Sequence, residues 1–208
     1  MLNSNTTELN CQITPRATLV ALGLKIRQLG ILKMMADCVK IEQKTIKDSP
    51  VEKLTDGLVT ILAGGQGLVE ANTRLRSDRA LQRAFGRSRC AEQSVISETL
   101  NACTATNVSQ LEQAAVSIYQ AHSAGYHHNY EQEWQVLEVD LSGQPCGPKA
   151  AFASKGYFAH RRNRRGRQLG RVYASLYEEV VVDQLYPGQT TLPQVLQAWL
   201  KLRTSASN

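Results

Sequence analysis

The spacing of hydrophobic residues changes near residue 125, from a helical period to an alternating one. Before that point apolar side chains recur every three or four residues, as they do along one face of a helix. The first 125 residues are therefore predicted to be mainly helical. The segments with helical spacing are 15–29, 50–63, 67–75, 78–85, 91–102 and 108–122.

One helix start is strongly marked, because Ser49 precedes Pro50 and Glu52 follows three residues after the serine. This is the pattern of a capping box, in which the two side chains satisfy free amide groups reciprocally. The short helices around Gly86 fit a helix-turn-helix with 91–102 as the DNA-reading helix. An ordinary helical bundle is the alternative, and the pattern alone favours it.

After residue 125 the chain alternates in the manner of β-strands, and the predicted order is β-β-β-α. We expect strands at 134–140, 167–176 and 179–186, and a helix at 192–203. Three strands and one helix lack the further strands that would complete a core. The sequence therefore predicts a helical domain over 1–125 and an incomplete α+β domain over 126–208. In the alternative, the first helices cover the sheet and form one α+β domain with it.

The composition points to a polyanionic partner, since 24 Lys and Arg residues exceed 18 Asp and Glu residues among 208, for a net charge of +6. The longest apolar stretch, 57–69, is too short for a bilayer span of about 20 residues. The polar N-terminus lacks the features of a signal peptide. We therefore expect a cytoplasmic protein with no membrane partner. Five scattered cysteines with no C-x-x-C pair predict free thiols.

A cluster of arginines is the strongest anomaly, because six fall within eleven residues and no Asp or Glu occurs from 141 to 177. Arginine binds phosphate with two parallel hydrogen bonds, so this cluster predicts contacts with a nucleic-acid backbone. The neighbouring Tyr157, Phe158 and His160 offer rings for stacking on unpaired bases. The alternative is a solvated basic hairpin loop. The candidate DNA-binding residues are Lys155, Arg161, Arg162, Arg164, Arg165, Arg167 and Arg171.

Asp140 is the candidate catalytic and metal-ligating residue, because it ends a predicted strand and shares a face with Glu138. A carboxylate on a rigid strand end suits a divalent cation. The competing interpretation is a cap on a turn over 140–143. Asp183 is expected to bond the turn at Pro187. The sequence has no nucleophile elbow or phosphate-binding loop, so no small-molecule substrate is expected.

Several segments in this order resemble DDE transposases of bacterial insertion sequences. They are LTDGLVTILAGGQGLVEANTRLRSD, QSVISETL, WQVLEVDLSGQPCG, KGYF, RRGRQLGRVYAS and VVVDQLYPGQT, and the resemblance covers about residues 50–200. It implies a ribonuclease-H-like catalytic fold of which this chain carries the first three strands and first helix. It further implies that Asp140 is the first catalytic aspartate and that two Mg²⁺ ions serve DNA strand cleavage and transfer. The family's second aspartate and its glutamate have no counterpart in this chain.

The chain is thus expected to be the N-terminal portion of a transposase and to be inactive alone. Its helical domain, residues 1–125, is the expected DNA-binding domain that recognises the terminal repeats of the element, while the arginine cluster binds phosphates without sequence preference. One alternative is a non-enzymatic DNA-binding or regulatory fragment. Another is an RNA-binding accessory protein, which would prefer single-stranded RNA. An unfinished sheet leaves a free strand edge, which predicts pairing of two chains into a homodimer.

Overall fold

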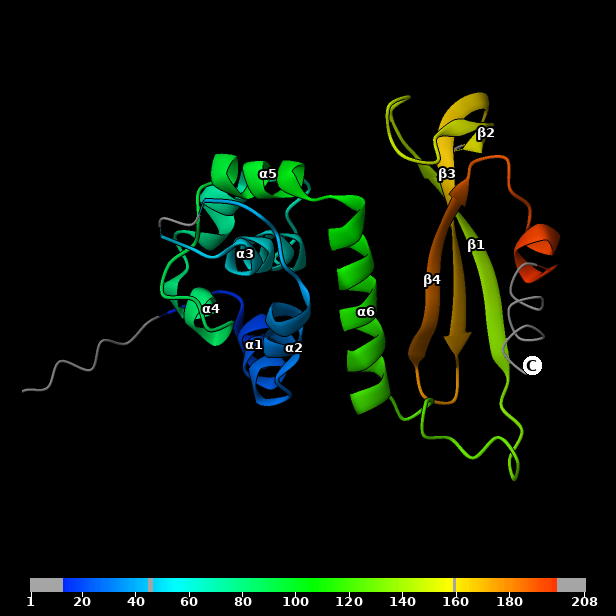
Figure 1. Ribbon diagram of the computed structural model, residues 1–208, viewed down its shortest axis with the longest axis horizontal. Coiled ribbons are helices and arrows are strands. Elements are labelled where there is room, and N and C mark those ends of the chain that lie inside the picture. The colour runs from blue at the N-terminus through cyan, green and yellow to red at the C-terminus, as the bar shows by residue number, and fades with distance from the viewer. Residues whose placement is uncertain (1–12, 45–46, 159, 198–208) are drawn as a thin grey trace, which may run out of the picture. The chain divides into compact units, whose positions relative to one another are not determined.

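The computed structural model describes residues 13–44, 47–158 and 160–197. The chain divides into two compact units, residues 1–121 and residues 122–208. Helices make up the first unit, and an antiparallel sheet dominates the second (Figure 1). The predicted α+β class is confirmed at this level.

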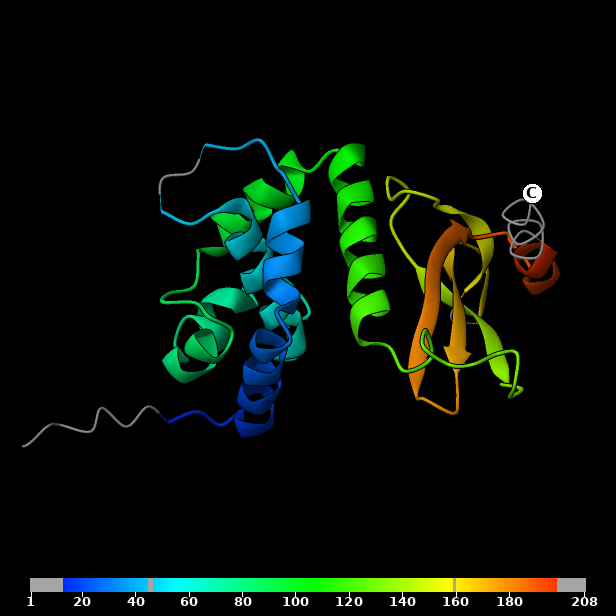
Figure 2. The same ribbon diagram turned by 60° about the horizontal axis from the view of Figure 1, so that its bottom comes forward.

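The helical unit is built on a core to which α3, η1, α4 and α5 contribute. Buried members of that core include Val59, Leu75, Leu81, Phe85 and Ile96. Short elements close around it because each carries only one apolar face. The elements are α1 (Ala17–Gln28), α2 (Ile31–Cys38), α3 (Pro50–Leu62), the π-helix η1 (Ala71–Leu75), α4 (Arg79–Ala84), α5 (Gln93–Ala102) and α6 (Ala105–His122) (Figures 1 and 2).

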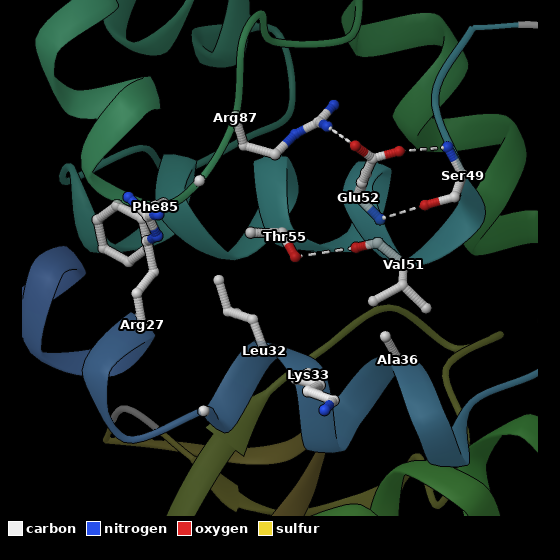
Figure 3. A pocket seen from close by; sticks show the side chains of 12 residues that line it. Arg27, Leu32, Lys33, Ala36, Ser49, Val51, Glu52, Thr55, Phe85 and Arg87 are labelled. Carbon is white, nitrogen blue, oxygen red and sulfur yellow. Dashed lines mark hydrogen bonds and ion pairs between the residues drawn. The ribbon is translucent and has the colours of Figure 1, made fainter.

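Helix α3 begins where its capping residues predict. The Ser49 hydroxyl accepts a hydrogen bond from the Glu52 amide at 3.3 Å, and the Glu52 carboxylate accepts one from the Ser49 amide at 2.7 Å (Figure 3). Pro50 occupies the first helical position. Gly64 follows the helix with φ of 84°, which ends it at a conformation that glycine adopts easily. Local chemistry therefore determines both ends of this helix.

A buried arginine joins α3 to the segment before α5. Arg87 donates from Nε to Asp56 Oδ1 at 2.9 Å and from its terminal nitrogens to Asp48 and Glu52. The Asp56 carboxylate also accepts from the Ala91 amide at 2.8 Å. Buried charges need partners of this kind. The network is therefore part of the scaffold of the helical unit.

The helix-turn-helix prediction is wrong for α4 and α5. Residues 85–92 separate the two helices, whereas the motif uses a turn of three or four residues. The predicted helix over 67–75 is also shorter than expected, because only Ala71–Leu75 is helical and its form is a π-helix. The helical-bundle alternative describes this unit better.

The sheet is organised around one long central strand, β3 (Arg161–Ala174). Strand β1 (Leu137–Pro145) pairs with residues 166–174 of β3, and β4 (Glu179–Pro187) pairs with residues 167–174. Because both strands pair with the same residues, they lie on opposite edges of β3 (Figure 1). The short β2 (Ser154–Phe158) pairs with the first part of β3. Residues 192–197 are helical, and the remainder of the predicted final helix lies outside the described residues.

One face of the sheet is buried and the other is open. On β3, Gly166, Gly170, Val172 and Ala174 are buried, while the side chains between them are exposed or half-buried. Val195, in the helical residues after β4, is fully buried and lies against Gly170. This alternation follows from the two-residue period of a strand.

Four glycines surround the ring of Phe158 on the buried side. A Cβ placed on Gly143, Gly156, Gly166 or Gly188 would lie within 2.9 Å of that ring. These glycines come from β1, β2, β3 and the residue after β4, so one ring joins all four strands. The ring is only 2% exposed. The prediction that Phe158 stacks on bases is therefore wrong, because the ring fills the core.

Candidate nucleic-acid interface

The arginine cluster lies in a strand and not in the solvated hairpin loop of the alternative interpretation. Arg161 pairs with Phe158, Arg164 with Gly156, and Arg165 with Lys155 across the β2–β3 hairpin. The register shifts between Gly156 and Phe158, which marks a β-bulge. Asn163, on the opposite strand, has φ of 56°, a conformation that asparagine tolerates. The arginines are thus held on an extended backbone.

This arrangement divides the cluster between the two faces of the sheet. Arg165, Arg167 and Arg171 are separated by even numbers of residues along β3, so they share the open face. Lys155 joins them as the cross-strand partner of Arg165. Arg164 falls on the opposite face. From residue 165 to residue 171 the row extends about 20 Å at the usual rise of a strand.

Arg171 differs from the other cations of the cluster because it is already neutralised. Its guanidinium donates two hydrogen bonds to the Asp183 carboxylate, at 2.8 Å and 2.7 Å. This pairing raises the pKa of Arg171 above its ordinary value. The sequence predicted that Asp183 would hydrogen-bond the turn at Pro187. In the structure it instead accepts hydrogen bonds from Arg171 on the neighbouring strand β3.

The remaining cations keep their charge available. Six cations of the cluster other than Arg171 form no ion pair within residues 13–44, 47–158 and 160–197. The Nε atom of Arg167 is buried and has no hydrogen-bond partner within the same ranges. These six cations, which we call the open cations, are Lys155, Arg161, Arg162, Arg164, Arg165 and Arg167.

Asp140 lies inside β1 and not at its end, which corrects the sequence prediction. The strand continues to Pro145, so residues 140–143 form no turn. Asp140 is exposed, faces Arg171 across the strands, and accepts a hydrogen bond from the Ser142 hydroxyl at 3.0 Å. Glu138, on the same face, accepts one from Ser175. The strand is longer than expected because β3 offers it partners up to Gly166.

The described residues do not by themselves fit a centre for two Mg²⁺ ions. No group of three or more His, Cys, Asp or Glu side chains in the part of the chain that the structure describes is arranged to hold a metal. Mg²⁺ requires octahedral oxygen coordination, and the nearby Asp183 carboxylate is bonded to Arg171. Asp140 is therefore a single candidate ligand, and no catalytic step follows from it alone.

The adjacent histidines are also without a metal-binding arrangement. His128 Nε2 lies 2.9 Å from the carbonyl oxygen of Glu133, which only accepts, so this nitrogen carries the proton. Nδ1 then accepts from the Tyr177 hydroxyl at 2.6 Å. Both nitrogens of His128 thus support the fold of the sheet unit.

A pocket of about 380 Å³ in the helical unit is a competing site (Figure 3). Arg27, Thr55 and Arg87 lie in its wall, yet each already bonds within the protein. Arg27 donates to the Arg83 carbonyl, and the Thr55 hydroxyl donates to the Val51 carbonyl. Arg87 is held by the carboxylates of its network. The polar side chains named here are therefore less available to a ligand than the cations of the sheet.

The sequence missed two features of the interface. The pairing of Arg171 with Asp183 depends on strand register, which no local pattern reveals. The burial of the Phe158 ring depends on glycines at 143, 156, 166 and 188. Their repeated occurrence in the sheet region was the one sequence feature that could have indicated a buried ring there.

Comparison with models of protein families, with curated proteins and with solved structures finds no match for this chain. In the described ranges, no helix combines the length and the apolar character that crossing a lipid bilayer requires. Functional arguments for this protein therefore depend on its sequence pattern and on the geometry of the sheet.

Proposed function

We propose that this chain binds DNA through the open cations of the β2–β3 hairpin, as part of a DDE-type transposase of an insertion sequence. The observation that carries the proposal is a set of six cations with no acidic partner in the described residues. Such a concentration of charge repels itself, and binding of a polyanion relieves the repulsion more fully than solvent and salt do. The antiparallel order β1-β3-β4, followed by a helix, supports a ribonuclease-H-like interpretation.

Binding uses the geometry of the guanidinium group. Each arginine presents parallel N–H donors that match two oxygens of one phosphate. Arg165 and Arg167 lie on one face of a rigid strand, so successive phosphates of a DNA backbone can run along it. These contacts carry no sequence information, so recognition of terminal repeats requires other residues.

Strand cleavage belongs to the complete enzyme of this proposal. Asp140 shares the open face with Arg165 and Arg167, so a backbone held by these arginines runs towards its carboxylate. Mg²⁺ bound there, with carboxylates that the resemblance assigns to later segments, would activate the attacking oxygen and stabilise the leaving one.

Two matched variants test the proposal. Arg165→Ala and Arg171→Ala each remove one exposed arginine from the same face of β3, but only Arg171 is ion-paired. Binding of a labelled duplex is measured by fluorescence anisotropy over a range of salt concentrations. We expect Arg165→Ala to reduce the slope of log K against log salt by about 0.9, the value for one lost phosphate contact. Arg171→Ala should leave the slope nearly unchanged.

Equal losses in the two variants would attribute binding to net charge rather than to the open cations. Unchanged binding in both, and in the triple variant of Arg164, Arg165 and Arg167 to Ala, would refute the proposal. Competition with scrambled DNA then decides whether this chain recognises terminal repeats, because equal affinity excludes specific recognition.

A further inference from the structure

An exposed aromatic side chain lies among the open cations. Tyr157 is 63% exposed, whereas the adjacent Phe158 is 2% exposed. The difference follows from strand alternation, because Phe158 points into the glycine-lined core and Tyr157 points to the open face. An exposed tyrosine ring beside cations offers a partner both an apolar face and a hydroxyl group.

The hairpin bulge determines what surrounds this ring. Gly156 pairs with Arg164 and Phe158 with Arg161, so the single residue Tyr157 faces the two residues 162 and 163. Lys155 lies two residues before Tyr157 on the same face. The rings of His160 and Tyr157 are nearly perpendicular, with centroids 6.5 Å apart and an angle of 85° between the planes. The Tyr157 ring therefore has cations on both strands and an aromatic neighbour.

Aromatic rings beside phosphate-binding cations are the elements of single-strand recognition. A base can stack on a protein ring only when it is not stacked within a duplex. The cations hold the backbone, and the ring holds the base attached to it. This combination differs from a row of cations alone, which binds duplex and single strand by charge.

We infer that Tyr157, with His160 beside it, stacks on an unpaired base, so that the preferred substrate is DNA carrying a single-stranded segment next to a duplex. The inference rests on the proposed DNA binding by the open cations and names its substrate class. Arg165 and Arg167 bind the phosphate backbone of the DNA, and Tyr157 favours an unpaired strand over a duplex by stacking on its base.

The test compares Tyr157→Ala with Tyr157→Phe in the full chain. The probes are a labelled oligothymidylate, a blunt duplex, and the same duplex with a single-stranded 3′ extension. Trp134→Ala is the control, because Trp134 is a fully exposed ring in the same unit and lies before β1, in a segment without cations. We expect Tyr157→Ala to weaken binding of the oligothymidylate and the extended duplex about tenfold, the usual effect of one lost base stack. Blunt-duplex binding should change less than twofold, and Tyr157→Phe and Trp134→Ala should bind all probes as the parent does.

Two results would overturn the inference while leaving DNA binding by the cations intact. One is an unchanged affinity of Tyr157→Ala for the single-stranded probes when Arg165→Ala still weakens duplex binding. The other is an equal loss on blunt and extended duplexes, which would make Tyr157 a general contact. Tighter binding of a matched RNA oligonucleotide than of the DNA one would overturn the assignment to DNA. Failure of the Arg165 test itself would refute the proposed function instead.

Discussion

Replacing Gly166 with Ala tests whether the ring of Phe158 holds the sheet together. The new Cβ would lie 2.7 Å from the Cδ2 and Cε2 atoms of that ring. Carbon atoms in contact normally rest about 3.5–4.0 Å apart, so an overlap of about 1 Å must be relieved. The ring cannot retreat freely, because Gly143, Gly156 and Gly188 approach it equally closely. Overpacking of this kind costs about 1–3 kcal/mol, and about 2 kcal/mol raises the open population of the sheet roughly thirtyfold.

Hydrogen–deuterium exchange of peptides from β3 measures the change in the open population of the sheet unit, separately from the helical unit. The matched background is Phe158→Leu, which removes the Cε2 and Cζ atoms that crowd the new Cβ and leaves only the Cδ position. We expect Gly166→Ala to cost about half as much or less in that background, because the two positions are coupled. A cost below about 0.5 kcal/mol in the parent chain would refute the packing argument. So would an equal cost in both backgrounds.

Two further predictions concern the arginine network of the helical unit. Arg87→Ala leaves the fully buried Asp56 without its partner, so urea denaturation followed by circular dichroism should show a loss of about 3–5 kcal/mol; a loss below about 1 kcal/mol would contradict the role of the network. Burial alone would raise the pKa of Asp48, but hydrogen bonds from Arg89 and Arg87 hold it below its ordinary value of 3.8. A lowered pKa stabilises the folded state above pH 3.8, and this contribution disappears as the pH falls through the folded-state pKa. Asp48→Asn should therefore lower the melting temperature at neutral pH and progressively less in acid; a constant difference between the variant and the parent would be inconsistent with the lowered pKa.

Local chemistry was enough to predict some of this protein from sequence. The capping box at Ser49 and Glu52 and the glycines after α3 determine that helix, because every group involved lies within a few residues. The change of hydrophobic period after residue 125 predicted the helical and sheet regions for the same reason. The density of arginines between 161 and 171 is likewise a property of the sequence alone. The transposase interpretation stays a prediction.

Only the tertiary structure decided which arginines lack an acidic partner and which aromatic rings are exposed to a ligand. Strand β2 is five residues long and contains a glycine, so no local pattern predicted that it would pair with the arginine segment and make it a strand. That pairing turned Tyr157 outward and Phe158 inward. The register of β1 and β4 on β3 placed Asp140 inside a strand and neutralised Arg171 with Asp183. Register depends on hydrogen bonds between segments distant in the sequence, and this is why the charges could be counted beforehand but their partners could not.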